Sequence, residues 1–444
     1  MVLTRMNKLL LLLGIYGLFS GTATAQNLYF PPITVGATWA TTPPQDLGFC
    51  PERIDSLYNF LEARDTKSFM LLKDGKIVLE KYFGTYTQDS IFYWASAGKS
   101  LAAFLVGLAQ DEGLLDINDK TSEYLGPGWT SLNPAQEDLI TIRHQLTMTT
   151  GLDDGVPDDN CLTPACLVFK ATAGTRWAYH NAPYHLTHNV VANASGITFQ
   201  QFTRTRLFQK VGMNGFWFNY VMYGRARDMA RFGLLTLAKG VWNGDTILHN
   251  QTYYHDMINT SQSLNKSYGY LWWLNGKPSF MFPASQFVFP GPLLSNAPAD
   301  MYSALGKDDQ KIHIVPSKGW VVVRQGLSAS ASLVPIDFDK DLWDYLNALE
   351  CTSSNEEIAT TNTTGIKAIP SVSTNSWTID CGAGYTRAIL LNGLGQVIQN
   401  ITILNGATTF QCGSASLAAG VYHVVVMDEH GRYDRVSVVK TAEN

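Results

Sequence analysis

Short apolar runs bounded by turn residues lie in two parts of the chain that are far apart, whereas between them the apolar residues mostly recur at helical spacing. Around Asp74-Gly75, two apolar runs form a strong hairpin signal. Strands are predicted within Phe69–Phe83, at Gln310–Val315 and at Gly319–Arg324. Helices are predicted at Pro51–Arg64, in the segment after Ser96 and at Asp337–Leu349. Strands from both ends with helices between them predict an α+β fold: an antiparallel sheet flanked by helices, with a helical subdomain.

A second pattern begins after Thr352–Ser376, a segment rich in Ser, Thr and Asn that reads as a linker. Short alternating strands separated by Gly-containing turns fill residues 377–444, which predicts a small all-β sandwich domain. Its strands are expected at Ala388–Leu391, Val397–Ile403, Gly420–Met427 and Val436–Val439.

Residues 1–25 have the pattern of a secretory signal peptide. Arg5 and Lys8 precede the apolar run Leu9–Phe19, and Ala23-Thr24-Ala25 offers a small-residue cleavage site. Residues 26–47 then form a Pro-containing leader to a domain at residues 48–351. The sequence therefore predicts an exported protein.

Composition and charge narrow the classes of function. The chain of 444 residues is 45% hydrophobic and 16% charged, which is typical of a globular protein. Because the signal segment carries two basic and no acidic residues, its removal takes the formal net charge from −5 to −7. The sequence has no polybasic patch, which argues against nucleic acid or an anionic membrane surface as a partner. No later apolar run is long enough to predict a membrane span.

Six cysteines in an exported chain favour disulfides over metal sites. The sequence contains no Cys-x-x-Cys motif and no Cys/His cluster with zinc spacing, so no metal is expected. Other pairings are open, but three pairs each join cysteines within one predicted unit. These pairs are Cys50 with Cys351, Cys161 with Cys166, and Cys381 with Cys412.

The first candidate for chemistry is Ser96-Ala-Gly-Lys99, where a turn runs into an apolar helix. Ser96 is expected at the first helical turn, where free backbone N–H groups and the positive end of the helix dipole face outward. Lys99 emerges on the same face, beside the serine hydroxyl. A hydroxyl needs a base to act as a nucleophile, and a buried lysine with a lowered pKa can be that base. The alternative is a helix start followed by a solvated lysine.

Two later segments offer partners. In Tyr179-His-Asn181 the Tyr hydroxyl could relay protons and the Asn amide could bind a substrate amide, although a buried Tyr and a capping Asn would look the same. Ala304-Leu-Gly306 stands at the edge of a predicted strand, where small residues let a substrate approach; a plain turn is the alternative. Trp272 and Trp273 are candidates for lining a pocket.

Taken in order, Ser96-Ala-Gly-Lys99, Tyr179-His-Asn181 and Ala304-Leu-Gly306 resemble the three motifs of the serine β-lactamase-related superfamily. They are most similar to its class C β-lactamase, esterase and 6-aminohexanoate-dimer hydrolase branch. The resemblance covers about residues 50–351 and implies a β-lactamase/transpeptidase-like fold and an active serine hydrolase.

Carried over residue by residue, this resemblance makes Ser96 the nucleophile and Lys99 its general base. Tyr179 would shuttle the proton to the leaving group and help to activate water for deacylation, and Asn181 would orient the acyl side of the substrate. The backbone N–H groups of Ser96 and Lys307 would form the oxyanion hole. The expected site is therefore catalytic Ser96, Lys99 and Tyr179, with Asn181, Ala304, Gly306 and Lys307 binding substrate.

Two departures from the family pattern bear on the substrate. Where β-lactamases and penicillin-binding proteins begin the third motif with Lys or His, a cation that meets the substrate carboxylate, this chain has Ala304. The departure favours amide or ester substrates without that carboxylate. Asp308 and Asp309 stand where this branch more often has small residues. They could narrow the pocket or select a cationic substrate end, or they could form a solvated turn.

The tail carries a second resemblance. Ala419–Lys440, with a Gly-x-Tyr strand, a Gly turn and a closing strand that ends in a basic residue, is similar to the C-terminal sorting domain of Bacteroidetes type IX secretion cargo. This resemblance implies contact with outer-membrane secretion machinery and a secreted or cell-surface location. A generic carbohydrate- or partner-binding β-sandwich is the alternative, and it would leave the protein in the periplasm.

The sequence thus predicts an exported hydrolase that cleaves small amide or ester substrates through a covalent acyl-enzyme on Ser96, without a cofactor. One alternative is a non-catalytic binding or sensor protein on the same fold, suggested by Asp308, Asp309 and the missing cation. Another is a D-alanyl-D-alanine peptidase or β-lactamase.

Overall fold

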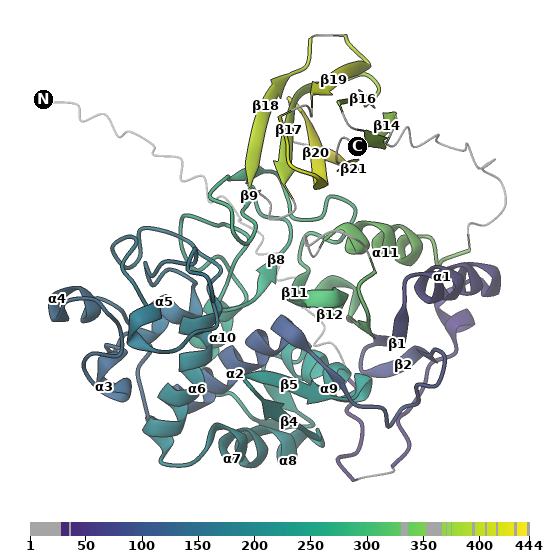
Figure 1. Ribbon diagram of the computed structural model, residues 1–444. Helices are drawn as coiled ribbons and strands as arrows, with labels where there is room; N and C mark the ends of the chain where they lie inside the picture. The colour runs from purple at the N-terminus through teal and green to yellow at the C-terminus, as the bar shows by residue number, and fades with distance from the viewer. Residues whose placement is uncertain are drawn as a thin grey trace, which may run out of the picture.

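The protein forms a larger mixed domain and a smaller all-β module (Figure 1). The computed structural model describes residues 28–34, 37–329, 336–351, 366–369, 371–373, 375–392, 396–404, 406–413, 416–429 and 433–441. The signal peptide predicted at residues 1–25 and residues 352–365 of the predicted linker lie outside the described residues. Within the described residues, no helix has the length and apolar character needed to cross a membrane.

A six-stranded antiparallel sheet forms the centre of the larger domain, in the order β2-β1-β13-β12-β11-β8. Its strands are β1 (Thr66–Lys73), β2 (Lys76–Tyr82), β8 (Trp273–Leu274), β11 (Tyr302–Gly306), β12 (Gln310–Val315) and β13 (Trp320–Gly326). Asp74 and Gly75 join β1 to β2 with φ values of +49° and +84°, as a tight hairpin turn requires. The predicted hairpin, and the sheet built from both ends of the domain, are confirmed.

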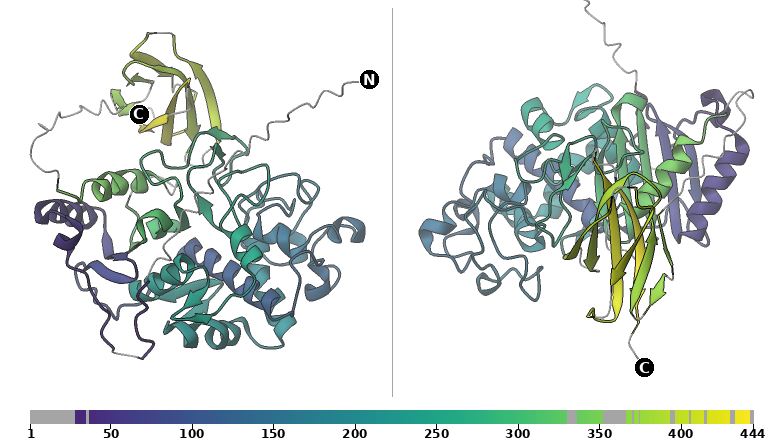
Figure 2. Two further views of the ribbon diagram at one scale, coloured as in Figure 1. Left: turned by 180° about the vertical axis from the view of Figure 1, so that it is seen from behind. Right: turned by 90° about the horizontal axis from the view of Figure 1, so that it is seen from above.

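Helices cover both faces of this sheet (Figure 2). On one face, α1 (Pro51–Ala63) packs against α11 (Asp337–Asn347), and the Phe60 ring stacks on the Tyr345 ring with centroids 4.5 Å apart. On the other face lie α2 (Gly98–Asp111) and α9 (Ala226–Leu237). At Gly233 of α9, an added Cβ would lie 2.4 Å from a Val321 methyl, so glycine lets the helix approach β13 closely.

The helical subdomain follows α2 in the sequence. Its α-helices are α3 (Ser122–Leu125), α4 (Pro134–Glu137), α5 (Ile142–Leu146), α6 (Asn181–Ser195), α7 (Phe199–Thr203), α8 (Gln209–Val211) and α10 (Gln251–Met257). It is accompanied by a three-stranded sheet in the order β3-β5-β4, formed by β3 (Phe92–Tyr93), β4 (Gly215–Phe218) and β5 (Val221–Gly224). The hydrophobic pattern did not predict this sheet, because strands of two to four residues are too short to show a period.

The C-terminal module is a β-sandwich, as predicted. Its two sheets have the orders β14-β16-β19 and β15-β21-β20-β17-β18. The strands are β14 (Lys367–Ile369), β15 (Val372–Ser373), β16 (Ser376–Asp380), β17 (Tyr385–Asn392), β18 (Val397–Thr402), β19 (Thr409–Gly413), β20 (Gly420–Asp428) and β21 (Tyr433–Lys440). Two of these, β14 and β15, fall within the range predicted as linker, where they pair with β16 and β21.

The module packs against the larger domain through the outer face of its five-stranded sheet, where Ile389, Leu391, Val425 and Met427 join the hydrophobic core of that domain. The Tyr433 hydroxyl donates a 2.7 Å hydrogen bond to the Leu293 carbonyl, and its ring centroid lies 5.7 Å from that of Phe280 in β9 (Ser279–Phe280). Asp434 and Arg435 form ion pairs with Lys340 and Asp337 of α11.

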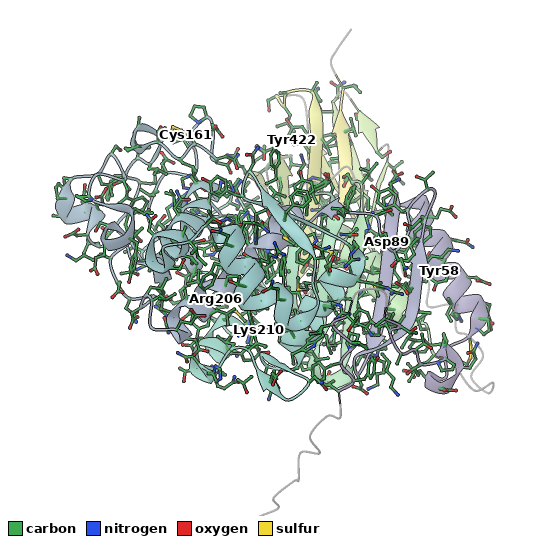
Figure 3. All side chains as sticks on the ribbon, turned by 90° about the horizontal axis from the view of Figure 1, so that it is seen from below. Tyr58, Asp89, Cys161, Arg206, Lys210 and Tyr422 are labelled. Atoms are coloured by element: carbon green, nitrogen blue, oxygen red, sulfur yellow. A yellow bond between two sulfur atoms is a disulfide. The ribbon has the colours of Figure 1, made fainter. Side chains whose placement is uncertain are left out.

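Two of the three predicted disulfides are confirmed. Cys50–Cys351, with Cα atoms 5.2 Å apart, ties the residue before α1 to the segment after α11. Cys161–Cys166 closes a short loop at the periphery of the helical subdomain (Figure 3).

The third predicted disulfide, Cys381–Cys412, is wrong, because both residues are free and buried. Their strands are neighbours, but the register separates them. Cys412 lies opposite Trp377, whereas the Cys381 backbone N–H donates to Thr408. Four steps of about 3.3 Å along a strand place the two cysteines about 13 Å apart, well beyond the roughly 4.4–6.8 Å between the Cα atoms of a disulfide.

We expect thiol titration of the denatured, unreduced protein to find two thiols, and one thiol in a Cys381→Ser variant. In the native protein these thiols should react slowly, because burial raises the pKa of Cys381 and raises that of Cys412 to about 11. A titration that finds no thiol after denaturation would show a third disulfide and would contradict the register of β16 and β19.

Candidate active site

Ser96 lies in a single 3₁₀ turn, Ala95–Ala97, that leads into α2. Ala95 has a φ of +47°, a left-handed conformation that is unfavourable for a residue with a side chain and is typical of strained functional turns. The end of β11 runs directly beside this turn. An added Cβ at Gly306 would lie 2.5 Å from the Trp94 carbonyl oxygen and 3.0 Å from the Ala97 nitrogen. Only glycine lets β11 reach the serine turn.

Lys99 is the buried amine of the site. Only 3% of the residue is exposed, in the first turn of α2. Its Nζ donates to Ser96 Oγ at 3.0 Å and to Asn181 Oδ1 at 2.8 Å, and it lies 4.4 Å from the centroid of the Tyr184 ring. Burial lowers the pKa of Lys99 to about 7, although Asp159 acts in the opposite direction. A substantial fraction of the amine is therefore neutral near pH 7 and able to accept a proton.

Tyr179 precedes α6 and lines the same pocket as Ser96. Its ring stacks on that of Trp273, with centroids 6.0 Å apart and an interplanar angle of 24°. Burial raises its pKa above the ordinary value, although a side-chain hydrogen bond with Ser96 acts to lower it. Tyr179 therefore keeps its proton near neutral pH, whereas Lys99 can release its own. The structure thus brings Ser96, Lys99 and Tyr179 together.

Asn181 begins α6, and its amide is oriented by an aspartate that the sequence analysis missed. Asn181 Nδ2 donates to Asp159 Oδ2 at 3.0 Å, which leaves Oδ1 to accept from Lys99. The Asp159 carbonyl also accepts from the Ala182 backbone N–H at 2.8 Å, at the start of α6. Asp159 stands in a loop within a run of polar residues, and no motif distinguishes it in the sequence.

A pocket of about 170 Å³ opens at Ser96. Its lining residues are Ser96, Tyr179, Trp273, Pro283, Leu305, Gly306, Lys307, Asp308, Asp309 and Ser328. Of the four predicted substrate-binding residues, Gly306 and Lys307 line it, whereas Asn181 is not among its lining residues and Ala304 is fully buried in β11. Trp273 lines the pocket as predicted, but Trp272 is buried in the core, 5.2 Å from the Tyr302 ring.

Asp308 and Asp309 form a tight turn after β11, with φ values of +58° and +57°. Asp309 is buried, lies 3.2 Å from the Lys311 amine and accepts a hydrogen bond from the Ala329 backbone, so it is not part of a solvated turn. The Asp308 carboxylate accepts a hydrogen bond from the Tyr93 hydroxyl. Contacts with Lys311, Ala329 and Tyr93 therefore fix the turn that follows the Lys307 backbone N–H.

Among the described residues, no group of three or more His, Cys, Asp and Glu side chains is placed to hold a metal ion.

The family model "Beta-lactamase" matches residues 60–325, well over half of the chain. The chain belongs to the beta-lactamase family. An uncharacterized protein of Alkalihalophilus pseudofirmus is 24% identical over 298 residues, which cover 58% of this chain and 82% of that protein. A Bacillus subtilis relative named "Putative penicillin-binding protein PbpX" is 27% identical over 187 residues, 38% of this chain and 46% of the relative, so the match spans less than half of that protein.

Solved structures agree on the fold of this beta-lactamase-family protein. The structure named "Putative 6-aminohexanoate-dimer hydrolase from Bacillus anthracis" aligns with a TM-score of 0.54 at 19% identity, over 73% of this chain and 90% of that chain. At this identity the likeness shows the fold alone.

The lowered pKa of Lys99 predicts how the reactivity of Ser96 depends on pH. The rate of phosphonylation of Ser96 by a fluorophosphonate probe should rise with pH through an apparent pKa near 7, as Lys99 loses its proton. In Asp159→Asn the loss of the negative charge destabilises the ammonium further, so the rise should move to lower pH. The exposed neighbour provides a control, Asp158→Asn, which should leave the profile in place. A profile that is the same in wild type and Asp159→Asn would contradict this electrostatic assignment.

Gly306→Ala should disrupt the approach of β11 to the serine turn, because the new methyl meets backbone atoms that cannot move alone. We expect a loss of about 1–3 kcal/mol in the free energy of unfolding, and slower labelling of Ser96. Gly413→Ala is the matched control, since an added Cβ there meets nothing within 4 Å. Denaturant unfolding and labelling rates measure both effects, and equal behaviour of the two variants would refute the close-approach argument.

Proposed function

We propose that the protein is a serine hydrolase that cleaves small amide or ester substrates through a covalent acyl-enzyme on Ser96. The observation that carries the proposal is the buried Lys99 amine, 3.0 Å from Ser96 Oγ, with a pKa lowered to about 7. A serine hydroxyl beside a neutral amine has the base that it needs to attack a carbonyl carbon.

In the acylation step, Lys99 accepts the proton of Ser96 as Oγ forms a bond to the substrate carbonyl carbon. The negative charge that develops on the carbonyl oxygen is stabilised by the backbone N–H groups of Ser96 and Lys307, which the close passage of Gly306 brings near each other. Tyr179 donates its proton to the leaving amine or alkoxide as the carbon–nitrogen or carbon–oxygen bond breaks, and it regains a proton from Lys99. Water, activated by the same groups, then hydrolyses the ester on Ser96. In this scheme Asn181 orients both the acyl part of the substrate and the Lys99 amine.

The third motif supports amide and ester substrates that lack a carboxylate next to the scissile bond. Position 304 is an alanine, so no cation at that position meets such a carboxylate. Lys307 and Asp308 instead place charges of both signs along the pocket. The second candidate is β-lactam or D-alanyl-D-alanine substrates, which membership in the beta-lactamase family favours.

We also propose that the protein is exported by its N-terminal signal and that the β-sandwich module is a sorting domain that contacts outer-membrane secretion machinery. The support is the strand and turn pattern of Ala419–Lys440, together with the separate sandwich fold of the module. A secreted or cell-surface location follows from this proposal, and a periplasmic one if the module only binds a partner.

Ser96→Ala should abolish both labelling by a fluorophosphonate probe and turnover of amide and ester substrates, because the variant lacks the hydroxyl that forms the proposed acyl-enzyme. Peptide mass spectrometry of the wild type should place the label on Ser96. Ser56→Ala, at an exposed position of α1, is the control for folding and handling. Undiminished labelling of Ser96→Ala would disprove the proposal. Acylation by a chromogenic cephalosporin would instead favour the second candidate.

A further inference from the structure

The small β3-β5-β4 sheet lies beside α2 (Figure 1). One of its faces packs on the start of that helix. Met222 of β5 is fully buried, and an added Cβ at Gly98 would lie 3.3 Å from Met222 and 3.3 Å from the Trp217 ring of β4. Since side chains alternate along a strand, Phe216, Phe218 and Tyr223 lie on the opposite face. That face is the one directed to solvent, because Phe216 is 44% exposed and Phe218 is 59% exposed.

The aromatic residues of this outer face form a continuous row across the three strands. Phe216 lies opposite Tyr223, and Tyr223 lies opposite Tyr93 of β3. The Phe216 and Tyr223 rings stack with centroids 5.3 Å apart and an interplanar angle of 4°, and the Tyr223 and Tyr93 rings are 6.4 Å apart. We call Phe216, Phe218, Tyr223 and Tyr93 the aromatic row.

The aromatic row ends at the candidate active site. Tyr93 is three residues before Ser96, and its hydroxyl donates to the carboxylate of Asp308, which lines the pocket at Ser96. Tyr93 therefore connects the aromatic row to a residue of the pocket wall.

The aromatic composition of this exposed face indicates a binding site. The exposed face of a small antiparallel sheet is ordinarily polar, and a contiguous exposed apolar patch on a soluble domain marks a site of interaction. Parallel, partly exposed rings favour stacking with another flat ring. Because Tyr93 is hydrogen-bonded to Asp308, which lines the pocket at Ser96, the occupant that fits best is a part of the substrate.

We propose that the aromatic row binds an aromatic ring of an extended substrate whose ester or amide bond lies at Ser96. This inference rests on the proposed function and narrows its substrate class to amides and esters that carry an aryl group several bonds from the scissile carbonyl. Asp308 and Tyr93 form the link between the two parts of the site.

The test compares two esters with the same scissile bond, a short acetyl ester and one with a phenyl ring on a flexible spacer. Phe216→Ala and Tyr223→Ala should each lower kcat/KM for the extended ester by at least about fivefold more than for the short one, mainly through KM, since one lost stacking contact is worth about 1 kcal/mol. Phe169→Ala, at a 45% exposed aromatic in another loop, is the matched control and should change neither value. Equal losses on both esters, or no loss, would overturn the proposal.

Binding to the Ser96→Ala variant separates this inference from the proposed function. Equilibrium dialysis of the extended ester against Ser96→Ala should show binding that Phe216→Ala weakens about fivefold. If this binding is found but the wild type hydrolyses neither ester, the catalytic proposal fails while the aromatic row stands. If the wild type is a dimer that Phe216→Ala dissociates in analytical ultracentrifugation, the occupant is a second copy of the chain and the aromatic row is not a substrate site.

Discussion

The interaction on which the rest of the site depends is the contact between the Lys99 amine and the Ser96 hydroxyl. An ammonium group excluded from water is costly, so burial lowers the pKa of Lys99 to about 7 and makes its neutral form available. Tyr179 is buried beside it, and burial raises the pKa of this hydroxyl, so Tyr179 keeps its proton. The same loss of solvation therefore produces a base and an acid next to one hydroxyl.

The fold supplies the burial and the alignment that this contact needs. β11, from the far end of the domain, passes the serine turn at a distance that only Gly306 permits. Asp159 orients the Asn181 amide, and Asn181 in turn accepts from Lys99, so a loop of the helical subdomain helps to set the position of the amine. Three parts of the chain thus converge on the pocket at Ser96.

The sequence predicted the features that depend on local pattern or on ordered motifs. The Asp74-Gly75 hairpin, the helix after Ser96 and the strands at both ends all have strong periodic or turn signals, and the beta-lactamase family model matches the range that contains the motifs. Features set by tertiary packing were missed. Asp159 belongs to no motif, and β4 and β5 are too short to show a hydrophobic period. Cys381 and Cys412 lie in one module, but the register of β16 and β19 places them too far apart to form a disulfide.

The central claim is that Lys99 is the base, and the most direct measurement is the titration of its own amine. Lysine side chains labelled with ¹³C at the ε position report the protonation of each amine by NMR, and Lys99→Met identifies the signal of Lys99 by its loss. We predict a midpoint near pH 7 for this resonance. A midpoint near the ordinary value of 10.5 would mean that Lys99 is a cation at neutral pH and would contradict the mechanism.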